Sequence, residues 1–148
     1  MIVLYDAECG FCRWAMAWAV RRDERHVLVA VPIQSPLGSE LLVDVAPGER
    51  LRSVRVVRDD GHRLSGGAAA AEVLDVLPST RFLGRLARGL PGTTAFLYRV
   101  VARRRVSFGR LVRGEARGRA DDLLNATSAT TAAELASREG RSTELGVP

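Results

Sequence analysis

The fold of this chain is decided by the stretch Ile2-Val3-Leu4-Tyr5-Asp6-Ala7-Glu8-Cys9-Gly10-Phe11-Cys12. Its first four residues are apolar and include two β-branched side chains, which predicts a short buried strand. A helical run follows from about Phe11 to Arg22, and Trp14 and Trp18 share one face of it at i, i+4 spacing. We expect both tryptophans in the core rather than at a substrate platform. A Cys-x-x-Cys motif therefore lies between a strand and the start of a helix.

Cys9 and Cys12 are the only two cysteines in the 148 residues. A bridge between them would close a loop of four residues and stabilise the fold by only about 2 kcal/mol, which makes it a poor staple. Such a pair suits thiol exchange, because the second thiol is always beside the first. A helix N-terminus also favours a thiolate. The motif predicts a redox-active dithiol; the alternatives are two buried thiols without a redox role, or half of a zinc site shared between chains.

Composition excludes several other kinds of chemistry. All 22 basic residues are arginine, so a Walker P-loop, a Schiff-base lysine and a Ser-Lys pair are ruled out. His26 and His62 are the only histidines, so a zinc site with three histidines is impossible. Neither G-x-S-x-G nor G-x-G-x-x-G occurs. We therefore expect no metal and no organic cofactor.

The rest of the first 78 residues predicts a regular alternation of strands and helices. Pattern and turn signals place a strand at 26–31 that Pro32 stops, a helix at 36–45, a loop at 46–49, strands at 53–58 and 62–65, and a helix at 66–77. The order β-α-β-α-β-β-α, with Cys-x-x-Cys after the first strand, predicts an α/β, thioredoxin-like redox core over residues 1–78.

At this point the chain resembles a known family. Asp6, Cys9 and Cys12 stand as in the D-x-x-C-x-x-C signature of the DCC family of predicted thiol-disulfide oxidoreductases. Similar stretches follow in the family's order, over roughly residues 1–110: Pro32-Ile33-Gln34-Ser35, Ser65-Gly66-Gly67-Ala68-Ala69, Leu90-Pro91, and Tyr98-Arg99-Val100-Val101-Ala102-Arg103. The resemblance implies thiol-disulfide exchange with a disulfide-containing protein or a small thiol as partner.

Three positions depart from the expected patterns. Ala95 stands where the family usually has an aspartate, three residues before the Tyr of its closing helix. Arg104-Arg105-Val106 stand where it usually has Asn-Arg-Tyr. Thioredoxin itself carries a cis-proline before its third strand, where this chain has Arg52-Ser53. We therefore expect substrate docking to differ from that of thioredoxin.

Three residues are the candidates for catalysis. Cys9, at the helix start, is expected to attack a substrate disulfide, and Cys12 to resolve the resulting mixed disulfide. Asp6 has two interpretations. It either caps the turn after the first strand, or it takes or relays the Cys12 proton when the mixed disulfide resolves.

Residues 79–113 predict an Arg-rich helical extension of the same domain. Nine arginines and no acidic residue lie between Val76 and Gly114, among apolar residues at helical spacing. One interpretation is a helical hairpin packed on the sheet with a solvated arginine face. The others are contact with an anionic membrane, with nucleic-acid phosphate or with an acidic partner, through Arg81, Arg85, Arg88, Arg103, Arg104 and Arg105. Such docking would suit the alternative function, a non-catalytic thioredoxin-like binding module.

The remaining residues, 114–148, predict a low-complexity tail that is largely disordered, with a helix near Thr131–Arg138. The N-terminal apolar run is too short for an export signal. No run approaches the ~20 apolar residues of a membrane span. We therefore expect a cytoplasmic protein without a transmembrane segment.

Overall fold

A four-stranded mixed sheet forms the centre of the molecule. The computed structural model describes residues 1–111 and 122–124, with side chains in the last long helix described up to Arg104. The strands are β1 (Ile2–Tyr5), β2 (Val29–Pro32), β3 (Arg55–Val57) and β4 (Arg63–Ser65), in the order β2-β1-β3-β4. β1 runs parallel to β2 and antiparallel to β3, which is antiparallel to β4.

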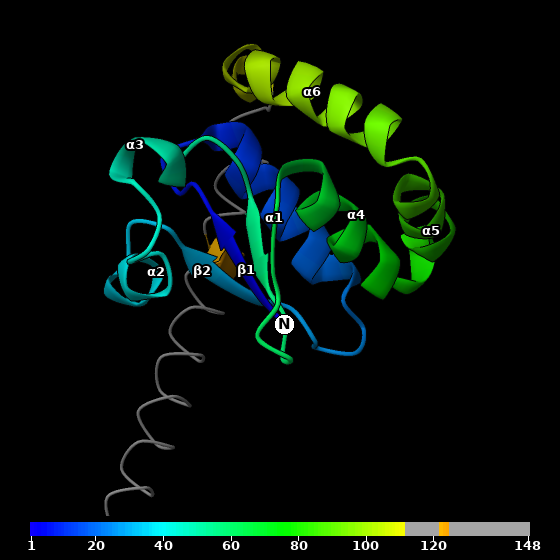
Figure 1. Ribbon diagram of the computed structural model, residues 1–148, viewed down its shortest axis with the longest axis horizontal. Helices are drawn as coiled ribbons and strands as arrows, with labels where there is room; N and C mark the ends of the chain where they lie inside the picture. Colours follow the sequence, from blue (N-terminus) through cyan, green and yellow to red (C-terminus); the bar gives the residue numbers. More distant parts are fainter. Residues whose placement is uncertain (112–121, 125–148) are drawn as a thin grey trace, which may run out of the picture.

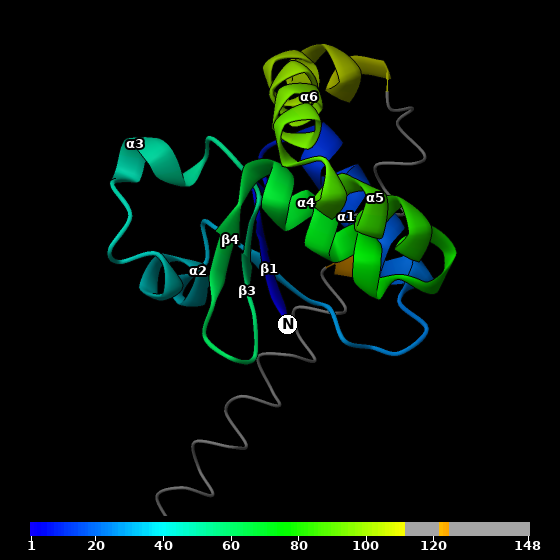
Figure 2. The ribbon, with the colours of Figure 1, turned by 45° about the vertical axis from the view of Figure 1, so that its right-hand side comes forward.

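Helices cover both faces of this sheet, as Figures 1 and 2 show. On one face, α1 (Gly10–Arg22) and α4 (Gly66–Val76) bury a core that includes Val3 and Tyr5. On the other face, α2 (Pro36–Leu41) covers Leu4 and Val31. Successive side chains of a strand point to opposite faces, so a fully apolar β1 supplies both cores. The strand order, the strand directions and the two helical layers define the thioredoxin-like α/β fold that the sequence predicted.

β2 differs from the prediction at both ends. It begins at Val29 rather than at His26, because His26 takes a left-handed backbone conformation with φ 51°. The Asp23 carboxylate accepts a hydrogen bond from the Leu28 amide at 2.6 Å, which fixes the path of the chain between α1 and β2. The strand also includes Pro32, paired with Tyr5. Proline is tolerated there because β2 lies at the edge of the sheet.

The connection between β2 and β3 also differs from the prediction. The expected helix at 36–45 ends at Leu41, and the expected loop at 46–49 contains a second short helix, α3 (Pro47–Arg50). Both helices have proline in the first turn, where its missing amide costs nothing. Pro47 therefore marks the start of a helix and not a loop.

Three helices follow the sheet and pack through small residues. After a short 3₁₀ turn, η1 (Pro78–Thr80), come α5 (Arg81–Gly89) and α6 (Pro91–Leu111). A Cβ added to Gly84 of α5 would lie 2.5 Å from Asp75 Cα in α4. A Cβ on Gly67 of α4 would lie 3.2 Å from Ala95 Cα in α6. The family's usual aspartate is thus replaced by a residue small enough for this close approach.

α6 is held at the end of the sheet where β1 leads into the Cys-x-x-Cys motif. The Val54 amide donates a hydrogen bond to the Tyr98 hydroxyl at 2.9 Å. Since Leu4 pairs with Arg55, Val54 lies near the carboxyl end of β1. Figures 1 and 2 both place α6 at the opposite end of β1 from the chain's N-terminus. From the sequence, the arginines of this helix were expected at the other end of the fold core from the dithiol. That expectation is wrong, because the Tyr98 hydrogen bond holds α6 beside the carboxyl end of β1.

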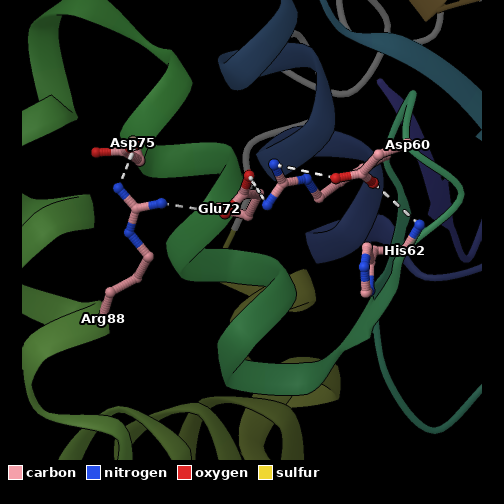
Figure 3. A network of polar contacts seen from close by, with 6 residues as sticks. Asp60, His62, Glu72, Asp75 and Arg88 are labelled. Atoms are coloured by element: carbon pink, nitrogen blue, oxygen red, sulfur yellow. Dashed lines mark hydrogen bonds and ion pairs between the residues drawn. The ribbon is translucent and has the colours of Figure 1, made fainter.

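The arginines of α5 are less available than the sequence suggested. Arg88 contacts both Glu72, at 3.4 Å, and Asp75, at 2.6 Å, on α4, as Figure 3 shows. Arg85 lies 3.9 Å from Asp75. The segment between Val76 and Gly114 contains no acidic residue, but in the folded protein α4 places two carboxylates beside these arginines. Arg85 and Arg88 are therefore partly neutralised, which corrects their place in the expected positive face.

One short segment beyond α6 belongs to the core. Leu124 is only 2% exposed and packs in the cluster between the sheet, α1 and α4, and Leu123 lies against the same cluster. The sequence pattern gave these leucines to a disordered tail, and for them that expectation is wrong. The rest of the expected tail, 114–121 and 125–148, lies outside the described residues, as does the Arg105 side chain.

Candidate active site

The two cysteines lie where β1 ends and α1 begins. Both side chains are half-buried. Cys9 is the N-cap of α1, with extended backbone angles of φ −86° and ψ 107°. Its carbonyl accepts the first helical hydrogen bond, from the Arg13 amide at 3.0 Å. The predicted position of the motif is therefore the observed one.

The Cys9 sulfur takes the part that a Ser or Asp oxygen plays at other helix starts. It accepts a hydrogen bond from the Cys12 backbone N–H at 3.3 Å. The amides of a first helical turn have no partner within the helix and attract negative charge. The contact therefore directs a backbone N–H at the sulfur that would carry the charge of a thiolate. Attack on a disulfide requires that charged form.

Asp6 organises the turn between the strand and the cysteines. Its Oδ1 accepts a hydrogen bond from the Glu8 amide at 3.0 Å, and its carbonyl accepts one from the Cys9 amide at 3.4 Å. The first of these contacts is a local Asx turn, in which a short carboxylate satisfies a backbone amide two residues on. Asp6 thus has the contacts of a capping residue, three positions before Cys9.

Gln34, in the turn that follows β2, holds the same segment from the neighbouring part of the chain. Its Nε2 donates to Asp6 Oδ1 at 2.8 Å, and its Oε1 accepts from the Ala7 amide at 3.1 Å. Both amide ends of one side chain are therefore used on consecutive residues of the turn. Sequence reasoning assigned Gln34 no role, although it lies in the Pro32-Ile33-Gln34-Ser35 stretch. That likeness was the one available signal.

The two tryptophans of α1 have different surroundings. Trp18 packs against the core between the sheet, α1 and α4, and the Arg22 guanidinium lies 4.4 Å from its ring centroid. Half-buried Trp14 packs against Phe11 of the motif, with ring centroids 5.9 Å apart. The core prediction is confirmed for Trp18. For Trp14 the described contact is with the motif itself.

The edge at which thioredoxin carries its cis-proline has a different construction here. The residues before β3 are Arg52, Ser53 and Val54, and no peptide bond in the described part of the chain is cis. The Val54 amide, beside the end of β1, already bonds to Tyr98. This departure supports the expectation of a substrate contact unlike that of thioredoxin.

Within residues 1–111 and 122–124, no three His, Cys, Asp or Glu side chains gather as metal ligands. No helix in these ranges has the length and apolarity needed to cross a bilayer.

A Cys-x-x-Cys dithiol at the helix start after the first strand of a thioredoxin-like sheet defines the thiol-disulfide oxidoreductase class. The model of the DCC1-like thiol-disulfide oxidoreductase family matches residues 3–111, and the chain belongs to that family. No curated protein and no solved structure matches the chain.

Proposed function

We propose that this protein reduces disulfides through Cys9 and Cys12, with a disulfide-containing protein or a small disulfide as substrate. The observation that carries the proposal is the hydrogen bond from the Cys12 amide to the Cys9 sulfur at the helix start. Family membership supports thiol-disulfide exchange in general. The reducing direction rests on the expected cytoplasmic location, where thiols are kept reduced.

The reaction proceeds in two exchange steps. The Cys9 thiolate attacks one sulfur of the substrate disulfide, forms a mixed disulfide and releases the other sulfur as a thiolate, which takes up a proton. Cys12 then loses its proton and attacks the Cys9 sulfur. The Cys9–substrate bond breaks, the second substrate thiolate leaves and is protonated, and a Cys9–Cys12 disulfide remains. Two electrons pass from the dithiol to the substrate.

The test is a single-turnover experiment with the full chain. Reduced protein is mixed with insulin, and its mass and the thiols released from insulin are measured over time. We expect one equivalent of insulin disulfide to be reduced per protein, while the protein loses two hydrogen atoms and gains the Cys9–Cys12 bridge. A protein that stays fully reduced would contradict the proposal and favour the non-catalytic binding module.

For Asp6 we propose that its carboxylate accepts the Cys12 proton before the second step. An oxygen placed in the turn that leads to Cys9 is close in sequence to both thiols, and a general base of this kind can accelerate proton transfer strongly. The capping contacts to Glu8 and Gln34 are compatible with this role, because they engage Oδ1. The two roles predict different kinetics.

Asp6→Asn keeps an oxygen acceptor for Glu8 and Gln34 but removes the charge and the basic oxygen. We expect formation of the mixed disulfide to change little, while its resolution slows by about tenfold or more. The reaction is stopped with acid at successive times, and the remaining free thiols are alkylated. Mass spectrometry then gives the amounts of mixed disulfide and of oxidised protein, which separates the two steps.

Gln34→Met is the matched control, because it removes both contacts to the turn and leaves the Asp6 carboxylate in place. We expect it to lower the free energy of unfolding by about 1–2 kcal/mol and to slow both steps alike. If Asp6→Asn also slows both steps alike, Asp6 is a capping residue and not a base.

A further inference from the structure

The outward faces of α5 and α6 expose large apolar side chains, contrary to a hairpin packed by its apolar faces. Phe82 is 76% exposed, Phe96 60% and Leu97 58%. Other large apolar residues at least one-third exposed on these helices or at the junction between them are Leu83, Leu86, Leu90, Val100 and Val101. Monomeric soluble proteins rarely expose large contiguous apolar patches, and patches of this kind mark interaction sites.

Helical geometry explains why these residues face outward. On α6, Tyr98 and Ala95 point to the body of the protein, through contacts with Val54 and Gly67. At 100° per residue, Phe96, Leu97 and Val100 then lie on the opposite side. On α5, Gly84 meets α4, and Phe82 and its apolar neighbours lie away from it. α5 thus packs through Gly84, and α6 packs through Ala95 and Tyr98, while the phenylalanines and most of the leucines of the two helices stay uncovered.

Arginines share the apolar face of α6. Arg103 and Arg104 follow Phe96 and Leu97 by two helical turns, so they lie on the same side of the helix. Both are exposed, and neither forms an ion pair within the described residues. No acidic residue occurs between Val76 and Gly114. The exposed face is therefore apolar and positively charged at once.

We infer that this α5–α6 face, defined by Phe82, Leu86, Phe96, Leu97, Arg103 and Arg104, docks on an anionic membrane surface. Helices that lie in the membrane interface combine exposed Phe and Leu with arginines, whose long stems let the charge reach the headgroups. Nucleic acid would use the arginines but would leave the phenylalanines in water. A second copy would bring the same arginines together without a carboxylate from these helices to pair with them.

The docked orientation has a consequence for the dithiol. α6 lies at the end of β1 that leads to Cys9, and it contacts α1. A membrane bound on the outer side of α6 would therefore lie at the same end of the molecule as the Cys-x-x-Cys motif. The inference is independent of the proposed chemistry, since binding can be measured without any substrate.

The test is co-sedimentation of the full chain with vesicles at low and at physiological salt. We expect binding to vesicles of equal parts phosphatidylglycerol and phosphatidylcholine, with much weaker binding to pure phosphatidylcholine. Phe82→Ser with Phe96→Ser should lower the partition coefficient at least about tenfold, because two aromatic side chains no longer enter the interface. Arg103→Gln with Arg104→Gln should weaken binding mainly at low salt, where charges are least screened. Both double variants should still reduce insulin.

Matched controls distinguish binding through this face from nonspecific electrostatic or hydrophobic binding elsewhere on the protein. Arg21→Gln with Arg25→Gln removes the same charge from exposed positions elsewhere, and Val43→Ser removes another exposed apolar side chain. Both should bind vesicles as the wild type does. Equal losses in the controls would overturn the inference, as would absence of vesicle binding at low salt. A dimer in solution that Phe82→Ser with Phe96→Ser dissociates would also overturn it, because a second copy would then cover the face.

Discussion

Cys9→Ser should abolish disulfide reduction, whereas Cys12→Ser should accumulate a covalent mixed disulfide with its substrate. The reason is the position of Cys9 at the helix start, where its sulfur accepts a hydrogen bond from the Cys12 amide. A serine hydroxyl does not attack a disulfide, so the first variant has no reactive group at this position. The second variant still attacks, but it lacks the thiol that releases the product. Non-reducing mass spectrometry after mixing with insulin measures both outcomes.

The order of thiol reactivity provides a direct check. Near neutral pH, iodoacetamide should modify Cys9 of the reduced wild-type protein before Cys12, because the thiolate is the reacting form. Peptide mapping at short times identifies the first site. The double variant Cys9→Ser with Cys12→Ser is the control and should form no adduct. Faster alkylation of Cys12 would reverse the assigned roles. The Cys12→Ser variant, which retains its substrate as a mixed disulfide, would also identify the natural substrate.

Gly84→Ala should destabilise the fold more than alanine at Gly89 or Gly92, where a Cβ would meet nothing within 4 Å. The new Cβ would lie 2.5 Å from Asp75 Cα and 2.7 Å from Asp75 Cβ, so α5 must move away from α4. That movement strains the core contacts and the bonds from Arg88 to Glu72 and Asp75. Overpacking of this kind costs about 2–3 kcal/mol. Urea denaturation measures the loss as a lower midpoint at unchanged slope.

Gly89→Ala is the matched control on the same helix. Nothing lies within 4 Å of a Cβ added at Gly89. Alanine also favours helix over glycine, so the free energy of unfolding should stay the same or rise by up to about 1 kcal/mol. If Gly84→Ala is equally neutral, α4 and α5 do not approach as closely as the structure has them.

Local patterns predicted much of the fold and the centre of the site. The apolar run of β1, the helical run after it and the turn signals place the strands and the first and fourth helices within a few residues. The same patterns put Cys9 at the start of α1, since a strand followed by a turn and a helix leaves little freedom at that junction. The predicted strand start at His26 was wrong. There the backbone is set by a hydrogen bond from the Leu28 amide to the Asp23 carboxylate, five residues earlier in the chain.

The sequence by itself therefore determined which residues form strands and helices, which side chains share a face, and that two thiols stand at a helix start. Only the tertiary structure decided which of those faces are covered. Gln34 reaches Asp6 across 28 positions, and Val54 reaches Tyr98 across 44. Glu72 and Asp75 neutralise arginines that the sequence leaves without acids nearby. Periodicity is a property of one helix, whereas burial and charge pairing depend on what the folded chain brings against it, so the exposed face of α5 and α6 became visible only in three dimensions.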